Sequence, residues 1–182
     1  MNTDDAVAMI FLETDRLIFR SHEPHDEPAF VHMQTDSEVR KYVGGEPWPL
    51  EKALTRFRKD YLGQPTDVFG LWATIRKSQG SYVGCCGLRA GSADARVFLA
   101  FYIATPFWRQ GFASEAAGAF IDVGFRRLRL SRLFAEVDSR NEVSIHILRK
   151  FGFLYLSEEL IPASSRIIST YELRNPASAR DT

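Results

Sequence analysis

Several features that would indicate common functional classes are missing from the sequence. It has only 2 cysteines, Cys85 and Cys86, which are adjacent and form a poor disulfide pair, and it has no CxxC motif. We therefore expect small, buried thiols in a strand and a reducing compartment, the cytoplasm. No apolar run approaches the roughly 20 residues of a membrane span. The short run AVAMIFL at 6–12 follows two aspartates and not a basic leader, which argues against a signal peptide.

An excess of charge of either sign is also missing. The chain has 23 basic and 23 acidic residues and a formal net charge of +0, so it lacks the basic surface of a protein that binds nucleic acid widely. Its 4 histidines include an HxxH pair, His22 and His25, but no acidic or cysteine ligand flanks them in a zinc pattern. We expect surface histidines, no metal, no nucleic-acid partner and no membrane partner.

The two common nucleotide fingerprints, GxxxxGK[ST] and GxGxxG, are absent as well. The chain nevertheless contains a small-residue turn, ATPFWRQGFASEAAGAF at 104–120, that joins an apolar strand to an alanine-rich helix. The first turn of a helix leaves N–H groups free and carries partial positive charge, so an anion fits there. Gly111 can adopt a positive φ, and Arg109 adds a cation nearby. The alternative is that Gly111 is only a hinge between a strand and a helix.

The 182 residues fit a single domain with a core at about 12–175 and short terminal tails. Hydrophobic periodicity predicts the order β-α-α-β-β-β-α-β-α-β-β, an α/β domain with a mixed sheet of about seven strands and about four helices. The expected strands are 13–21, 69–77, 81–90, 98–104, 131–140, 153–161 and 166–174, and the helices lie within 22–43, 44–63, 113–128 and 141–152.

Three segments in order resemble the GNAT superfamily of acyl-CoA-dependent N-acetyltransferases. They are LETDRLIFR at 12–20, WRQGFASEA at 108–116 and NEVSIHILRKFGF at 141–153, the last with Asn141, Ser144, Lys150, Gly152 and Phe153. The match looks closest to the branch of the RimJ and RimL ribosomal-protein N-terminal acetyltransferases. That branch shares an aromatic residue at the position of Trp108, where most of the superfamily has Gln or Arg.

The resemblance implies a GNAT-like fold, in which the sheet is splayed in the middle and acetyl-CoA lies in the wedge. Strand 98–104 would be the splayed strand, bulged so that backbone groups near Phe101 to Ile103 face the thioester. N–H groups from about Arg109 to Ser114 would hold the pyrophosphate. The expected cofactor-binding residues are therefore Phe101, Ile103, Trp108, Arg109, Gln110, Gly111, Phe112, Ala113, Ser114 and Asn141.

The catalytic groups differ from the common family pattern. Many members protonate the leaving thiolate with a tyrosine seven residues after the motif asparagine, where this chain has Leu148. Ser144, which the RimL-like branch shares, is the expected catalytic residue, and the alternative is that it only caps its helix. Asn141 would contact pantetheine or be the N-cap itself. Glu136, Asp138 or water remain candidates for the general base.

These observations predict an N-acetyltransferase that transfers an acetyl group from acetyl-CoA to a primary amine by direct attack in a ternary complex. The acceptor would be a protein N-terminal α-amine or a small amine such as a polyamine, amino sugar or drug. A homodimer is possible by analogy with similar proteins. The alternative from another class is a non-catalytic acyl-CoA-binding regulatory module.

Overall fold

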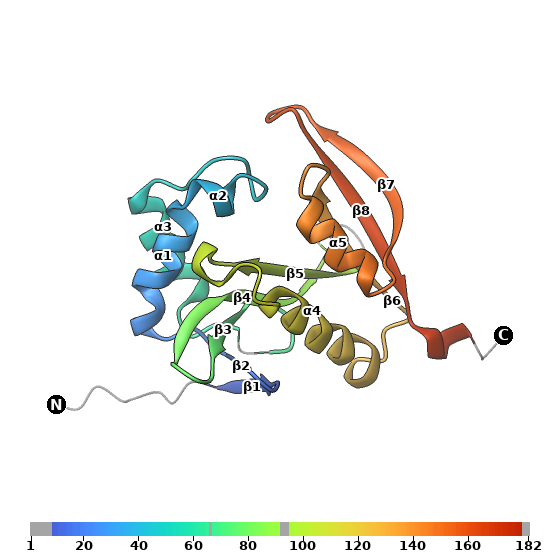
Figure 1. Ribbon diagram of the computed structural model, residues 1–182, viewed down its shortest axis with the longest axis horizontal. Helices are drawn as coiled ribbons and strands as arrows, with labels where there is room; N and C mark the ends of the chain where they lie inside the picture. Colours follow the sequence, from blue (N-terminus) through green and yellow to red (C-terminus); the bar gives the residue numbers. More distant parts are fainter. Residues whose placement is uncertain (1–8, 66, 92–94, 180–182) are drawn as a thin grey trace.

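The computed structural model of the chain describes residues 9–65, 67–91 and 95–179. Its centre is one sheet in the order β1-β2-β3-β4-β5-β6-β8-β7 (Figure 1). The strands are β1 Ile10–Glu13, β2 Leu17–Arg20, β3 Trp72–Arg76, β4 Ser81–Ala90, β5 Val97–Ile103, β6 Arg132–Asp138, β7 Leu154–Ile161 and β8 Arg166–Arg174. The helices are α1 Glu27–Thr35, α2 Ser37–Arg40, α3 Leu50–Arg56, α4 Phe112–Asp122 and α5 Glu142–Lys150. Short 3-10 or π turns occupy Pro24–Asp26, Phe57–Tyr61, Thr105–Phe107, Val123–Arg127 and Pro176–Ala179.

The amino-terminal part differs from the sequence prediction in two places. The single strand expected at 13–21 is a hairpin, because the N–H of Thr14 donates to the carbonyl of Leu17 at 2.9 Å and β1 folds back on β2. The sheet therefore has eight strands and not about seven. The first expected helix divides into α1 and α2 at Asp36, whose backbone is extended and whose side chain accepts from the N–H of Glu38.

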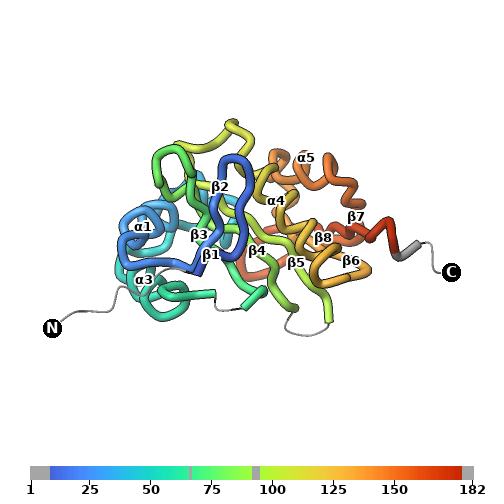
Figure 2. Tube along the Cα trace, turned by 90° about the horizontal axis from the view of Figure 1, so that it is seen from below, coloured from blue at the N-terminus to red at the C-terminus, as the bar shows by residue number. Residues whose placement is uncertain are grey.

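Two hydrophobic clusters cover the two faces of the sheet. Leu17 and Phe19 belong to the cluster beneath α4 and α5, whereas Ile18 packs with α1 and α3 on the other face. This alternation confirms the pattern expected of a strand. Figure 1 shows α1, α2 and α3 gathered at one side and α4 with α5 at another, and Figure 2 shows α1 and α3 apart from α4 and α5. The two faces are therefore covered by separate groups of helices.

The sheet splits between β5 and β6, its parallel pair. Among the described residues these strands pair only at Phe98 and Phe134, so they separate toward the carboxyl end of β5. The splay implied by the resemblance is present. The expected bulge is not in the pairing of β5 with β4, which is continuous from Gly84↔Ile103 to Ala90↔Val97. The register shift lies one ladder away, between β3 and β4, where a side chain on Gly84 would collide with the carbonyl of Tyr102.

Cys85 and Cys86 are free thiols with 0% exposure in β4, which confirms the buried thiols predicted from the sequence. Among the described helices, none is long and apolar enough to cross a membrane. The expected terminal tails lie mainly outside the described residues.

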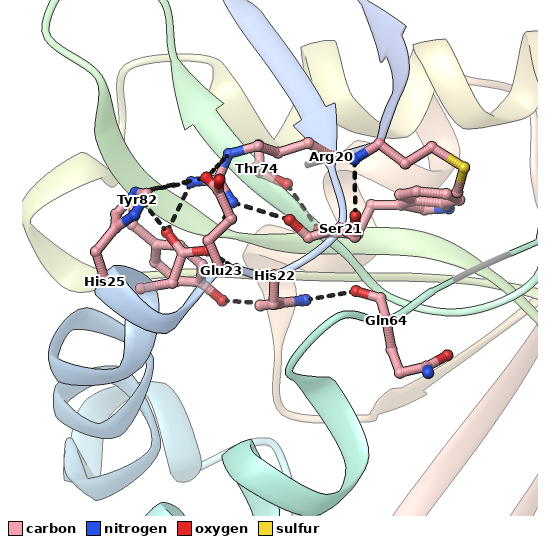
Figure 3. A network of polar contacts seen from close by, with 11 residues as sticks. Arg20, Ser21, His22, Glu23, His25, Gln64, Thr74 and Tyr82 are labelled. Carbon is pink, nitrogen blue, oxygen red and sulfur yellow. Dashed lines mark hydrogen bonds and ion pairs between the residues drawn. The ribbon is translucent and has the colours of Figure 1, made fainter. Parts of the chain in front are cut away.

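The expectation of surface histidines is wrong for His22, which is 2% exposed. Figure 3 shows its ring between Gln64 and Tyr82, with Nδ1 at 3.1 Å from the Gln64 carbonyl and Nε2 at 3.3 Å from the Tyr82 hydroxyl. Because a carbonyl only accepts, Nδ1 carries the proton and Nε2 accepts from Tyr82. Burial lowers the pKa of His22 to about 4, so the ring is neutral.

Candidate active site

The split between β5 and β6 opens into a cavity of about 220 Å³. It is bounded by β5, β6, α5, the start of β8 and the loop that follows α2. The lining residues are Tyr42, Val43, Leu99, Ala100, Phe101, Tyr102, Ala135, Glu136, Val137, Asp138, Asn141, Ser144, Leu148, Arg166 and Ile168.

Residues from both faces of the sheet line the cavity. On the α4–α5 face it is lined by Leu99, Ala135 and Val137, which belong to the cluster beneath these helices. Tyr102, by contrast, packs with the cluster beneath α1 and α3. By strand alternation Glu136 lies on that second face too. Side chains of both faces therefore meet at the split.

The edge of β5 offers backbone groups to this cavity. The N–H of Ala104 donates to Val83 in β4 at 2.9 Å, so alternation along an extended strand directs the N–H groups of Phe101 and Ile103 away from β4 and toward β6. The carbonyl of Ile103 accepts a hydrogen bond of 2.6 Å from Nε1 of Trp108. Phe101 and Ile103 thus lie on the open edge, and Trp108 anchors the following loop to that edge.

The loop before α4 has the backbone geometry of an anion site. Gly111 is the N-cap with φ 82°, and Arg109 also has a positive φ of 60°. Within the described part of the chain, no N–H group from residues 109–114 donates a hydrogen bond, and the first donor is Glu115, which bonds to Gly111. A cluster of free amides at the start of an 11-residue helix fits a pyrophosphate.

Two side chains of this loop have contacts within the protein, whereas those of Trp108 and Arg109 are exposed. Phe112 is 2% exposed, and Nε2 of Gln110 donates to the carbonyl of Pro106 at 2.9 Å. Their backbone is therefore the part that can meet a ligand. Among the described residues, the loop lies outside the lining of the 220 Å³ cavity, whereas Phe101, Asn141 and Ser144 are part of that lining.

Arg16 supports the loop, and sequence reasoning missed it. Its Nε lies 2.6 Å from Oε2 of Glu115, and its Nη1 donates to the carbonyl of Gln110 at 2.9 Å. The guanidinium stacks on Phe112 at 4.6 Å from the ring centre. Burial raises the pKa of Glu115, but hydrogen bonds from Thr14 and Arg16 outweigh it and hold the pKa below its usual value. Arg16 lies in LETDRLIFR, but the motif itself does not indicate this long-range contact.

The first turn of α5 brings Asn141 and Ser144 to the cavity. Asn141 is the N-cap, because its Oδ1 accepts from the N–H of Ser144 at 3.1 Å. Ser144 is therefore not the cap, and among the described residues its hydroxyl takes part in no hydrogen bond. Phe151, the residue after α5, lies against α4 at Gly118, where a Cβ would be 3.2 Å from its ring.

The two candidate carboxylates have different surroundings. Asp138 is 1% exposed and accepts from Nε of Arg140 at 2.9 Å and from Nε of Arg166 at 2.9 Å. Hydrogen bonds from Arg140 and then Arg166 hold the pKa of Asp138 well below its usual range. Glu136 is exposed at the cavity, and within the described residues it belongs to no ion pair or hydrogen bond. Glu136 is therefore unpaired at the cavity among the described residues, whereas Asp138 is bound by two arginines.

Among the described residues, no group of three or more His, Cys, Asp or Glu side chains could hold a metal ion.

Comparisons with known proteins agree with this geometry. Residues 16–154 match the acetyltransferase (GNAT) domain family. The chain is 32% identical over 145 residues, 78% of its length and 81% of the relative, to the uncharacterized N-acetyltransferase YoaA of Bacillus subtilis. It is 35% identical over 137 residues, 70% of its length and 68% of the relative, to the spermidine N(1)-acetyltransferase of Escherichia coli.

Solved structures show the same fold. A GNAT-family acetyltransferase from Bacillus anthracis superposes with a TM-score of 0.79 at 22% identity, covering 91% of this chain and 99% of that one. A spermidine N-acetyltransferase from Vibrio cholerae, solved with CoA and spermine, gives a TM-score of 0.69 at 16% identity, and the match covers 89% of this chain and 97% of that one. The chain belongs to the GNAT family of acetyltransferases and is an enzyme of that type, with acetyl-CoA as the general acyl donor.

Proposed function

We propose that this enzyme transfers the acetyl group of acetyl-CoA to a primary amine by direct attack in a ternary complex, within a single acetyltransferase domain. The observation that carries the proposal is the cavity at the split between β5 and β6, which residues from both faces of the sheet line. It lets the donor approach from the α4–α5 face and the acceptor from the α1–α3 face. Alignment of two reactants in this way contributes several kcal/mol to the rate enhancement.

Three groups of residues would bind acetyl-CoA and assist its reaction. The amides of 109–114 would hold the pyrophosphate, with positive charge added by Arg109 and Arg16. The N–H groups of Phe101 and Ile103 would polarise the thioester carbonyl, because they lie on the open edge of β5. Asn141 orders the first turn of α5, and the Ser144 hydroxyl would donate a hydrogen bond to the leaving thiolate.

Glu136 is our proposed general base. Its carboxylate faces the acceptor side and is free among the described residues, whereas Asp138 is bound by two arginines. The amine nitrogen bonds to the acetyl carbon, the carbon–sulfur bond breaks, and the proton lost by nitrogen goes to Glu136 directly or through water. The same negative charge would attract an ammonium group before the reaction.

Two acceptor classes remain in the proposal, a small amine and a protein N-terminal α-amine. The relatives named spermidine acetyltransferases favour a polyamine or another small amine. The likeness of residues 12–20 and 108–116 to the RimJ/RimL branch favours the α-amine. Glu136 suits both classes, because each presents a cation that must lose a proton.

We also infer the setting of the enzyme from its surface and thiols. The edge strand β7 exposes Leu154, Tyr155 and Leu156 to solvent by 73%, 54% and 48%, and an open apolar edge favours a homodimer contact. The free thiols of Cys85 and Cys86 favour the reducing cytoplasm.

An assay of CoA release tests the function. Purified protein would be mixed with acetyl-CoA and either spermidine or a synthetic peptide with a free N-terminus, and the product identified by mass spectrometry. We expect one mass increase of an acetyl group on one of these amines. Tight acetyl-CoA binding without transfer to either amine or to any amine of a wider panel would contradict the proposal and support the non-catalytic alternative.

A further inference from the structure

Arg166, the first residue of β8, connects two parts of the cavity wall. Its Nε donates to Oδ2 of Asp138 at the end of β6, at 2.9 Å. Its Nη2 donates to the backbone carbonyl of Tyr42, in the loop after α2, at 2.6 Å. The side chain of Arg166 is only 12% exposed. One guanidinium therefore bridges Asp138 at the carboxyl end of β6 and Tyr42, which lies more than 90 residues earlier in the chain.

This loop, residues 41–49, connects α2 to α3 and borders the cavity. Tyr42 and Val43 are part of the cavity lining. Gly44 and Gly45 have positive φ angles of 83° and 93°, and a Cβ on Gly45 would lie 3.5 Å from Cδ of Arg166. The loop turns back on α2 through bonds from the N–H groups of Val43 and Gly45 to the carbonyl of Arg40.

Its attachment to the far wall is sparse. Among the described residues, the bond from Arg166 to Tyr42 is the only hydrogen bond that joins residues 41–49 to β6, α5 or β8. The anchor at the other end is firm, because Asp138 is 1% exposed and ionised between Arg140 and Arg166. Arg140 is 62% exposed in its side chain, so Arg166 is the better shielded partner.

We propose that Arg166 is a positioning residue that fixes loop 41–49 over the acceptor side of the cavity and so controls acceptor binding, but not acetyl-CoA binding. The inference rests on the proposed function for its acceptor. The donor side is built from β5, the 109–114 loop and α5, and Arg166 bonds to none of these three elements among the described residues. An arginine suits this role because its fork reaches two acceptors at fixed angles, which an ammonium group does not.

The test compares Arg166→Met and Arg166→Lys with Arg174→Met. Arg174 is at the other end of β8, 78% exposed in its side chain and paired with Glu172 at 3.0 Å. Like Arg166 it is an ion-paired arginine of β8, but unlike Arg166 it is not among the cavity-lining residues. For whichever amine is acetylated, spermidine or the peptide, both Arg166 variants should raise the acceptor KM by at least about 10-fold. Their acetyl-CoA Kd should stay within about twofold of the native value. An unchanged acceptor KM, or an equal loss of acetyl-CoA affinity, would overturn the proposal.

Hydrogen exchange keeps this result separate from the proposed function, because it needs no acceptor. Amides of 41–49 should exchange at least about 10-fold faster in both Arg166 variants than in the native protein or Arg174→Met. Arg166→Lys retains a cation beside buried Asp138, so this variant keeps the test valid if Arg166→Met fails to fold. If the native protein acetylates no amine, the proposed function fails, and the bridge itself is then judged by exchange alone. Equal exchange in all four proteins would refute it.

Discussion

The hydroxyl of Ser144 lies in the cavity with its hydrogen-bonding capacity unused among the described residues. We predict that Ser144→Ala lowers kcat by about 10²-fold, the usual range for loss of one hydrogen-bond donor to a developing negative charge. The acetyl-CoA Kd should not change, because Asn141 still caps α5. Steady-state kinetics and calorimetry measure the two quantities.

Ser139→Ala is the matched control for Ser144, since Ser139 precedes the same helix but is not among the cavity-lining residues. Native turnover in Ser144→Ala would remove this hydroxyl from the mechanism.

A second prediction concerns Glu136 as the general base. Glu136→Gln should lower kcat/KM for the acceptor by about 10²-fold near neutral pH. The loss should shrink as pH rises toward the ordinary pKa of the acceptor, about 10 for an alkyl amine and about 8 for an α-amine, because more of the amine is then already neutral. Glu142→Gln, an exposed carboxylate in the first turn of α5, is the control. A pH–rate profile that Glu136→Gln leaves unchanged would assign the base to water.

At the scale of elements, α5 depends on its cap. Asn141→Ala removes the side-chain oxygen that accepts from the N–H of Ser144, and loss of an N-cap costs about 1 kcal/mol in the free energy of unfolding. Asn141→Asp should keep most of that stability, since aspartate caps equally well. Urea unfolding of the three proteins measures the difference, and equal midpoints would show that the cap contributes nothing.

The elements with strong periodicity could be predicted from the sequence. Strand β2 was indicated by the alternation of Leu17 and Phe19 against Ile18, and α4 by its alanine-rich face. The hairpin β1–β2 could not, because its turn has no glycine or asparagine. The hairpin is instead supported by a hydrogen bond of 2.6 Å from the Thr14 hydroxyl to the carboxylate of Glu115, which lies 101 residues later in the chain.

The candidate site was predictable to the same degree. The free amides at 109–114 and the cap at Asn141 each depend on a few residues close together in the chain, so a short sequence motif is enough to predict them. The roles of Arg16 and Arg166 depend on contacts between distant segments, so no local pattern reveals them. Burial of His22 has the same cause, since Phe30, Phe57 and Tyr61 surround it only after folding.

At the scale of the whole molecule, His22 should make stability depend on pH. Its pKa is about 4 in the folded protein against 6.5 when exposed, so the unfolded chain binds more protons between these values. The contribution is present above about pH 6.5 and is lost as pH falls toward 4, with a total of about 3 kcal/mol.

Denaturant unfolding at a series of pH values tests this contribution. His22→Gln should flatten the stability curve between pH 6.5 and 4, whereas replacement of the exposed His146 by Gln should leave its slope unchanged. An equal slope in His22→Gln and the native protein would contradict the burial effect.

The central claim, that the start of α4 holds acetyl-CoA, is tested most directly by calorimetric titration with acetyl-CoA. The native protein is compared with Gly111→Trp and Gly80→Trp. Both glycines have positive φ, 82° and 63°, so backbone strain is matched, but Gly80 lies in the turn between β3 and β4 with no neighbour within 4 Å of its Cβ. We predict that the native protein and Gly80→Trp bind acetyl-CoA alike and that Gly111→Trp loses binding by at least about 10-fold. Equal binding by all three, or none by the native protein, would contradict the claim.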